Sequence, residues 1–560
     1  MGEGRALCCS SVCFRRKMVV QLGSRDVGPD ARVRGQLRLC RPSRAPAVFT
    51  VVGVLLAAIG ACLAPFWPSL FNYVLSTELS ISPTSASFKL WRDTPVPMKL
   101  DFYFWNWTNP GEITNRDTKP TFVQMGPYRF NEVHEKINIT WHDNGTVSYR
   151  QIRRWFFDPD NSNGTLDDEV TTLNIIALTA SFVTREWSFV MRKGLDIALW
   201  QMGQKLHVTH QVRQLLFEGY ESPLITMADR LPALAGIDIP YDRFGWFYSR
   251  NGSADFDGVF NMRTGADDLY RVGELARWNY DERTRFFPGR CGNVEGSAGE
   301  LWPPKRSKDD RIGLFSPDLC RSIELDFRQE DEVLGLRGFR YSGGPSLLDN
   351  GTLDPANECF CAGECVASGV LNVSSCRYGA PAFVSYPHFY LADERLPAAV
   401  HGMSPDEHRH SFYVTLEPET GIPLDVAARF QINILLQQQS YISMLRGVPR
   451  VFFPMLWFEE RASITEELAR PLRLLLLMPT CGLAASLASC AAGVVALLIA
   501  TGLRLREHRA RTRPAKSGAV SGAALEVSLP LMDATDKASS EKLEVQTARS
   551  RLASSSSSST

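Results

Sequence analysis

Two long uncharged segments limit what this chain of 560 residues can fold into. The first covers residues 46–67 and the second covers residues 474–503. Each is long enough to cross, as a helix, a hydrocarbon core that is roughly 30 Å thick. The second is longer than a straight span requires, which indicates tilt or an interfacial start near Pro479. Because core helices of soluble proteins rarely reach this length without a charge, we predict two transmembrane helices.

The charges that flank these segments predict their orientation. Basic residues precede the first segment and follow the second, and such residues favour the cytoplasmic side. They are Arg32, Arg34, Arg38, Arg41 and Arg44, and then Arg504, Arg506, Arg509, Arg511, Arg513 and Lys516. The first segment starts well inside the chain and lacks a small-x-small cleavage site, so we expect a retained signal-anchor. Residues 68–473 are then extracellular, and the tails 1–45 and 504–560 are cytoplasmic.

The N-glycosylation sequons agree with this orientation, because N-x-[ST] is used only in the secretory lumen. All seven sequons lie between the two spans and none lies in a tail. Their acceptors are Asn106, Asn138, Asn144, Asn163, Asn251, Asn350 and Asn372.

The extracellular segment contains six cysteines, an even number that leaves no obligatory free thiol. They are Cys291, Cys320, Cys359, Cys361, Cys365 and Cys376. In an oxidising compartment such thiols pair, and several connectivities are possible in principle. Cys359 and Cys361 are too close in the chain to pair comfortably with each other. No His-x3–5-His follows at zinc-finger spacing, so we predict disulfides in the region 291–376 and no metal site.

The extracellular segment has two kinds of sequence pattern. Runs rich in aromatic and β-branched residues, broken by Asn, Gly and Pro, indicate antiparallel strands. These runs are KLDFYF, TFVQM, YRFNEV and VSYRQIRRWFF, and, from Phe244 onward, FGWFYS, GVFNM, APAFVSY, SFYVTL and ARFQINILL. Between Val170 and Ser222 two sets of apolar residues have helical spacing instead. The sets are Val183, Trp187, Val190 and Met191, and Val208, Val212, Leu215 and Leu216. We therefore predict an α+β protein with a helical insert in a β body.

Composition and motifs argue against several function classes. Lys+Arg and Asp+Glu both number 61, so no net charge attracts the whole chain to nucleic acid. The extracellular segment lacks a nucleophile elbow, a zinc-protease helix and a phosphate loop. His388 is expected to be a partly buried histidine at a strand end, and His207 and His210 lack an evident third metal ligand. We predict no catalytic residue, no metal and no cofactor, and hence no enzyme.

Four basic residues in the helical insert are candidates for ligand binding. Arg192 and Lys193 lie in one predicted helix, and Lys205 and Arg213 lie in the next. If the two helices pack as a hairpin, these cations share one exposed tip that suits phosphate or carboxylate head groups. The alternative, an ordinary solvated face, stays open at this point.

The two tails have different compositions. Cys8, Cys9 and Cys13 lie beside basic residues in the amino-terminal tail, and both acylation and unmodified thiols fit this pattern. The carboxy-terminal tail ends in a serine run and is expected to be disordered.

Several motifs give the chain a family resemblance. They are NPGEI at 109–113, GPYRF at 126–130, RFGWFYSRNGS at 243–253, CRS at 320–322, PHFYLADERL at 387–396, EPETGIPL at 417–424 and PMLWFEE at 454–460. Together with the two spans, they make the chain resemble the class B scavenger receptor family over nearly the whole extracellular segment. RFGWFYSRNGS is similar to invertebrate surface members, while GVLNVSSC and PHFYLADER are similar to the lysosomal membrane branch.

The resemblance implies a particular architecture. It implies an antiparallel β-barrel-like ectodomain, a helical bundle at about residues 170–235 that we call the apex, and an apolar tunnel toward the bilayer. It also implies the disulfides Cys291 to Cys359, Cys320 to Cys376 and Cys361 to Cys365. Arg192, Lys193 and Lys205 become the candidate apex contacts. The lysosomal branch has a histidine where EWSFVM places Met191 here.

The same resemblance implies the partners and the function. The partners are lipids, lipoprotein particles, anionic phospholipid surfaces, apoptotic cells, microbes and further copies of the same chain. We expect a plasma-membrane receptor that transfers lipid through its tunnel to the membrane. The alternative is a lysosomal membrane protein that sorts cargo or exports lipid.

Overall fold

The structure of this chain, a computed structural model, describes residues 44–230 and 241–512. Within it, residues 49–497 form one compact unit. The predictions for Cys8, Cys9 and Cys13 and for most of the carboxy-terminal tail lie outside the described residues.

Within residues 44–230 and 241–512, two helices are long and apolar enough to cross a membrane. The first, α1 (Ala45–Leu63), covers most of the first predicted span, and α2 (Phe66–Leu79) follows it after a short turn. The second predicted span lies within α10 (Glu466–Thr512), which continues through Pro471 and Pro479. The chain is therefore an α+β membrane protein with two spans, as the sequence predicts.

Small residues let α1 and α10 approach each other closely. A Cβ atom on Gly60 would lie 2.5 Å from the carbonyl oxygen of Ser486, and a Cβ on Gly493 would lie 2.5 Å from the amide nitrogen of Ala57. Helices in lipid associate through such close backbone packing, because lipid offers no hydrophobic drive for association. Trp67, in α2, adds a polar contact to this packing, because its Nε1 donates a hydrogen bond of 2.9 Å to the Ser486 hydroxyl.

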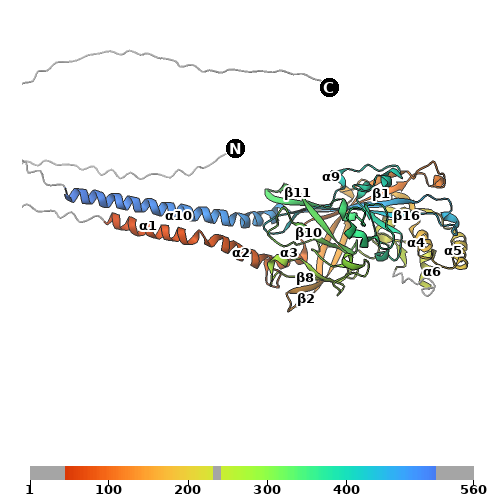
Figure 1. The fold of residues 1–560 in the computed structure, drawn as a ribbon, viewed down its shortest axis with the longest axis horizontal. Coiled ribbons are helices and arrows are strands. Elements are labelled where there is room, and N and C mark those ends of the chain that lie inside the picture. The colour runs from red at the N-terminus through yellow and green to blue at the C-terminus, as the bar shows by residue number, and fades with distance from the viewer. Residues whose placement is uncertain (1–43, 231–240, 513–560) are drawn as a thin grey trace, which may run out of the picture. The chain divides into compact units, whose positions relative to one another are not determined.

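The main body is one large antiparallel sheet, which we call the barrel (Figure 1). Along its principal path the strand order is β10-β11-β12-β15-β16-β17-β1-β2-β3-β8-β9, with β13 and β14 attached beside β16. In this order, the strands are β10 (Arg311–Ser316), β11 (Arg321–Val333), β12 (Leu336–Ser342), β15 (Tyr413–Leu416), β16 (Pro423–Leu436), β17 (Val451–Ser463), β1 (Met98–Trp107), β2 (Phe122–His142), β3 (Thr146–Phe157), β8 (Phe260–Arg263), β9 (Leu275–Trp278), β13 (Val370–Asn372) and β14 (Ala382–Ser385). Three further helices are α3 (Ala86–Asp93), α8 (Arg395–Ala398) and α9 (Glu407–His410).

Most of the predicted strand runs are strands in this sheet. TFVQM and YRFNEV belong to one continuous strand, β2, whose register with β1 shifts between Phe102 and Phe104. FGWFYS is the exception, because only Arg243–Phe244 forms a short strand, β7, which pairs with β6 (Tyr220–Glu221). After it, the amides of Trp246 and Phe247 donate to the carbonyls of Leu215 and Leu216, so this segment bonds to the apex rather than to the barrel.

A segment around Ser297 links the two edges of the barrel sheet. Ser297 N donates to Gly313 O at 3.0 Å and Phe315 N donates to Ser297 O at 2.8 Å, both on the β10 side. On the other side, Leu275 N of β9 donates to Gly296 O at 2.8 Å. The sheet is thus nearly closed, and its edge strands are not left as unpaired rows of backbone groups.

The main elements of the described part of the apex are helices and a two-stranded hairpin. The helices are α4 (Ile175–Val183), α5 (Phe189–Gln201) and α6 (Pro223–Arg230), and the strands are β4 (Glu169–Leu173) and β5 (His207–Gln211). Figure 1 shows α4, α5 and α6 grouped at the end of the sheet farthest from α3. The described part of the apex ends at residue 230, so the predicted boundary near 235 lies outside the described residues.

The helix predicted around Val208 to Leu216 is wrong. Residues 207–211 form β5, in which Thr209 pairs with Thr171, and only Gln214–Glu218 forms a π-helical turn. Both strands of this hairpin contain Val and Thr, which favour extended backbone once a partner strand is available. Val212, Leu215 and Leu216 are buried, but they lie in the turn that follows β5. A strand followed by a turn thus produced the apolar spacing that is typical of a helix.

Three disulfides link the region from residue 291 to residue 376. They are Cys291–Cys359, Cys320–Cys376 and Cys361–Cys365. These are the pairs that the family resemblance implies. The first two close long loops, of 68 and 56 residues, and such loops restrict the unfolded chain most.

Closure of the sheet gives a first prediction. Gly296 has φ +84°, and a Cβ atom there would lie 2.4 Å from the carbonyl carbon of Gly313. Gly296→Ala should therefore destabilise the fold by about 1–3 kcal/mol, through a strained backbone and a forced separation of β10. The control is Gly111→Ala, because Gly111 has no atom within 4 Å of the added Cβ. Equal thermal denaturation midpoints for the two variants of the full chain would contradict this account of closure.

Candidate functional site

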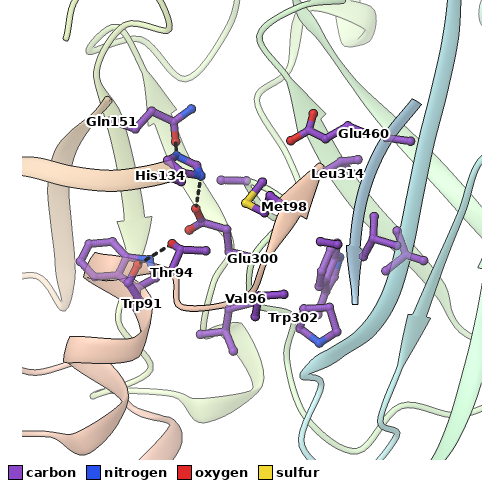
Figure 2. Close-up of a pocket in the computed structure, with 18 of the residues that line it drawn as sticks. Trp91, Thr94, Val96, Met98, His134, Gln151, Glu300, Trp302, Leu314 and Glu460 are labelled. Carbon is purple, nitrogen blue, oxygen red and sulfur yellow. Dashed lines mark hydrogen bonds and ion pairs between the residues drawn. The ribbon is translucent and has the colours of Figure 1, made fainter. Parts of the chain in front are cut away.

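The barrel contains a cavity of about 390 Å³, which we call the barrel cavity (Figure 2). Much of its wall is apolar and comes from β16, β17 and α3, with Phe430, Phe458 and Trp91 as large contributors. Phe430 and Phe458 point inward because alternate residues of a strand face opposite sides of a sheet, whereas Trp91 reaches the cavity from α3. An apolar cavity of this size suits an aliphatic or sterol-like molecule better than a polar one.

One end of the barrel cavity is formed by residues next to the membrane helices. Leu79 is the last residue of α2, and Leu468 and Leu472 lie in the first two turns of α10. Leu472 is followed closely by Leu474, where the predicted second span begins. The cavity therefore extends from the barrel interior to the foot of the helix that enters the bilayer.

A polar cluster lines another part of the same cavity (Figure 2). His134 and Gln151 share a hydrogen bond of 2.9 Å, and Gln151 donates a second one, also of 2.9 Å, to Asp257. Glu300 pairs with the fully buried Lys136 at 2.6 Å and lies 3.7 Å from His134. Burial lowers the pKa of His134 well below its usual value, so this imidazole is neutral.

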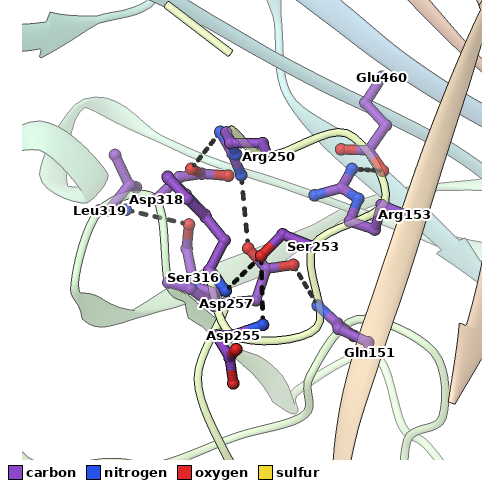
Figure 3. Close-up of polar contacts among 12 residues, drawn as sticks. Gln151, Arg153, Arg250, Ser253, Asp255, Asp257, Ser316, Asp318, Leu319 and Glu460 are labelled. Carbon is purple, nitrogen blue, oxygen red and sulfur yellow. Dashed lines mark hydrogen bonds and ion pairs between the residues drawn. The ribbon is translucent and has the colours of Figure 1, made fainter. Parts of the chain in front are cut away.

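Arg153 connects two carboxylates within this cluster. Its guanidinium lies 2.6 Å from Glu132. It also lies 2.9 Å from Glu460, and Figure 3 shows this second pair. Glu132 is fully enclosed, whereas 27% of the Glu460 side chain is accessible and faces the cavity. Arg153 also packs over the Trp155 ring, 5.1 Å from its centroid.

A second ion-pair group lies beside it (Figure 3). Arg250 lies 3.0 Å from Asp318 and 3.5 Å from Asp257, and Arg377 reaches Asp318 at 3.4 Å. Asp318 occupies the turn between β10 and β11 and lines the barrel cavity.

The two cavity carboxylates of this region titrate differently. Burial raises the pKa of Glu460 to about 7, since the favourable charge of Arg153 is opposed by Glu132 and Asp318. Burial would also raise the pKa of Asp318, but Arg250 and Arg377 together lower it to about 2. Near neutral pH, Asp318 is ionised and Glu460 is close to its midpoint.

A second cavity, of about 450 Å³, lies among the helices of the apex, and we call it the apex cavity. Its wall is also mostly apolar and includes Ile176, Val183, Met191 and Leu195. Arg377 and Tyr378 from the disulfide region close one side. The apex thus offers an apolar space of its own.

The structure places the three predicted apex contacts in different surroundings. Arg192 stacks on the Tyr441 ring, 4.2 Å from its centroid, and the Lys193 amine donates to Asp196 at 3.1 Å and to the Tyr441 carbonyl at 3.0 Å. Lys205 is exposed and precedes β5 rather than lying in a helix. Arg192 and Lys193 thus lie together beside Tyr441, whereas Lys205 lies in a separate part of the apex sequence.

Phe189, Ile197 and Trp200 of α5 are 57%, 55% and 78% exposed. They occupy the same face of α5 as Lys193, because positions three or four apart are neighbours on a helix. The exposed surface of α5 therefore combines apolar and basic side chains.

The histidines considered as candidate chemistry have other surroundings. His388 is buried, shares a hydrogen bond of 2.9 Å with Gln124 and stacks on His410 at 4.2 Å. Burial, together with His410, lowers its pKa to about 3. His207 and His210 lie three residues apart in a strand, so their side chains point to opposite faces. Among the described residues, no group of three or more His, Cys, Asp or Glu side chains is placed to hold a metal ion.

The predicted glycosylation sites remain predictions, and their exposure differs. Asn138, Asn144, Asn163 and Asn251 are exposed, and Asn106 is half-buried. Asn350 and Asn372 are only 4% and 7% exposed, so a glycan there requires attachment before this region folds.

Sequence analysis missed the acidic residues of the barrel cavity. Glu460 appears in the PMLWFEE motif only as a family signature, and Asp318 and Glu300 carry no local signal. The one available hint was a charged residue at an inward position of a strand, and it can be recognised only after the facing strands are known.

The pKa of Glu460 gives a second prediction. Its pKa is raised from 4.5 in the unfolded chain to about 7, so the folded state binds this proton more tightly. This tighter proton binding stabilises the folded state fully below pH 4.5, and the stabilisation is lost as the pH rises through 7. It amounts to at most about 3 kcal/mol of the free energy of unfolding. Glu460→Gln should therefore gain stability relative to the unmodified chain as the pH rises across this window.

The measurement is the difference between the denaturation midpoints of Glu460→Gln and of the unmodified chain, at each pH. Titratable groups that both proteins share cancel in this difference. His134 and His388, whose pKa values are lowered, cause an opposite trend in both proteins. A difference that does not change with pH would show that Glu460 titrates normally.

Comparison with known proteins agrees with the earlier resemblance. A model of the CD36 family matches residues 51–504. Protein peste of Drosophila melanogaster is 38% identical over 436 residues, which cover 77% of this chain and 78% of that protein. Scavenger receptor class B member 1 of Rattus norvegicus is 34% identical over 412 residues, 73% of this chain and 79% of the relative. Lysosome membrane protein 2 of Homo sapiens is 34% identical over 426 residues, which cover 75% of this chain and 86% of that protein. The chain therefore belongs to the CD36 family, the family of the class B scavenger receptors.

Proposed function

We propose that this chain is a cell-surface scavenger receptor that binds lipid-bearing particles at its apex and transfers lipid through the barrel cavity to the membrane. The observation that carries the proposal is the course of the barrel cavity, from the barrel interior to Leu79, Leu468 and Leu472 beside the membrane helices. Its apolar wall provides a route on which a lipid need not cross water.

The energetics favour passive transfer. Each CH2 group that leaves water for an apolar environment gains about 0.8 kcal/mol, so a free lipid in water faces a large desorption barrier. A protein cavity lowers this barrier without any covalent step. The proposed activity therefore needs no catalytic residue and no cofactor.

The apex is the proposed capture surface. Arg192, Lys193 and Lys205 supply positive charge for lipoproteins, modified or anionic lipids, apoptotic cells or microbes. The exposed Phe189 and Trp200 add apolar surface that suits a lipid monolayer. The apex cavity is the proposed first acceptor of lipid.

We place the receptor in the plasma membrane with both termini in the cytoplasm. The 34% identity to Lysosome membrane protein 2 supports a second candidate, a lysosomal membrane protein that sorts cargo or exports lipid. Location distinguishes the two candidates. Residence in lysosomes at steady state that depends on a cytoplasmic tail would favour the second.

A blocked cavity gives a third prediction. Ala428 lines the barrel cavity, and Ala428→Trp should fill part of it. We expect lipid uptake into cells that express the full chain to fall about tenfold, while particle binding at the apex is retained. The control is Ala398→Trp, because Ala398 is exposed in α8 and does not line the cavity. Unchanged uptake by a normally expressed Ala428→Trp chain would reject transfer through the barrel.

Charge reversal at the apex gives a fourth prediction. Changing Arg192, Lys193 and Lys205 to Glu should weaken the binding of anionic particles several-fold, and more strongly at low salt. Lys205→Glu alone is the cleanest single test, since Arg192 and Lys193 also contact Tyr441. The matched control reverses the exposed Lys89, Lys99 and Arg461, which lie outside the apex sequence. Equal binding by both triple variants at normal surface abundance would exclude a cationic capture surface.

A further inference from the structure

The polar part of the barrel cavity carries more negative than positive groups. Asp257, Glu300, Asp318 and Glu460 line it, whereas Arg153 is the one Lys or Arg among its lining residues within the described ranges. His134 also lines it but is neutral, because burial lowers its pKa. A molecule inside the cavity therefore faces an acidic wall.

Apart from Arg153, the cations that pair with these carboxylates are absent from the described cavity lining. Lys136, which holds Glu300, has no exposed side-chain surface, and Arg250, which holds Asp257 and Asp318, is 7% exposed. Neither lines the barrel cavity. Lys136 and Arg250 therefore stabilise the ionised carboxylates, while the carboxylates form the surface that faces the cavity.

The accessible surface of the individual groups leads to the same conclusion. The side chains of Asp318 and Glu460 are 36% and 27% accessible, and that of Arg153 is 11% accessible. Arg153 is also shared between Glu132 and Glu460, so its charge is largely compensated. It is poorly placed to bind an incoming anion.

We propose that Glu460 and Asp318 act as a charge filter in the barrel cavity, which admits lipids with a neutral hydroxyl group and excludes lipids with a free carboxylate. The inference rests on the proposed transfer function and specifies its substrate class. A hydroxyl group donates a hydrogen bond to a carboxylate, and such charge-assisted bonds are strong. A second carboxylate at the same place meets like charge in an environment that screens poorly.

The apolar wall does not make this distinction. Alkyl chains of equal length contact Phe430, Phe458 and Val426 in the same way whether the head group is an alcohol or an acid. Selectivity between two such lipids therefore reports on the acidic wall alone, and a matched pair of probes can measure it.

The experiment compares the uptake of hexadecanol and palmitate, both isotopically labelled, into cells that express the full chain. It is run above pH 7, because the pKa of Glu460 is about 7 and its carboxyl must be ionised. Uptake that depends on the chain should be about tenfold lower for palmitate than for hexadecanol, because the palmitate carboxylate meets the like charges of Glu460 and Asp318 at the cavity surface. In Glu460→Gln with Asp318→Asn, uptake of palmitate should approach that of hexadecanol.

Both substitutions leave the neighbouring cations with partners. Arg153 keeps its two hydrogen bonds to Glu132, and Arg377 keeps the carbonyl of residue 318 at 2.6 Å. Arg250 keeps Asp257. Surface abundance and the denaturation midpoint show whether the double variant folds, and Glu332→Gln, on the exposed side of β11, is the control for a lost negative charge.

The outcomes separate this inference from the proposed function. Equal uptake of both lipids by the unmodified chain would overturn the charge filter and leave the transfer function standing. A selectivity that persists in the folded double variant would overturn the roles of Glu460 and Asp318. No chain-dependent uptake of either lipid would overturn the transfer function and, with it, the filter.

Discussion

The pairing of β1 with β17 is the constraint on which the rest of the structure depends. Met98, at the start of β1, pairs with Ala462, near the end of β17. β17 ends only a few residues before α10, and β1 follows α2 and α3 along the chain. This one ladder therefore joins the parts of the chain that lead to the two membrane helices. It also pairs Glu460 with Leu100, and the Glu460 side chain lines the barrel cavity.

Burial of several charges in this cavity needs a physical reason. Ion pairs in a low-dielectric interior barely repay the desolvation of their members, and apolar side chains of similar volume are often at least as stable. Glu132, Arg153 and Glu460 thus contribute little to stability that a leucine or phenylalanine could not contribute. The network does hold polar groups at fixed places on an otherwise apolar surface. This is the arrangement that an apolar pocket needs to orient one end of an amphiphile.

The sequence predicts the features that depend on local chemistry. Residues 46–67 and 474–503 are recognisable by length and lack of charge, and KLDFYF is recognisable as a strand by its aromatic and β-branched residues. The helix predicted around Val208 is wrong because its apolar spacing fits both a helix and a strand followed by a turn. The pairing with Thr171 decides between them, and that pairing is a tertiary fact.

The cavity wall could not be predicted for the same kind of reason. Glu460 and Asp318 are 142 positions apart in the sequence, and they face one cavity only because β17 and the β10–β11 turn belong to one nearly closed sheet. The disulfides show the contrast. That the six cysteines form disulfides follows from the oxidising compartment predicted for them. The residues alone left several pairings open, and only the family resemblance specified the pair Cys320 and Cys376.

The two proposed recognition surfaces have opposite charge, and this affects what such a receptor can deliver. Arg192, Lys193 and Lys205 at the apex favour particles with an anionic surface, whereas Glu460 and Asp318 disfavour anionic molecules inside the barrel. Capture and transfer would then select different components of one particle. The negative lipids that bring the particle to the receptor would remain on its surface, and neutral hydroxyl lipids would enter the cavity. A single sign of charge along the whole route would lack this separation, because lipids that bind the apex tightly would also occupy the interior and block it.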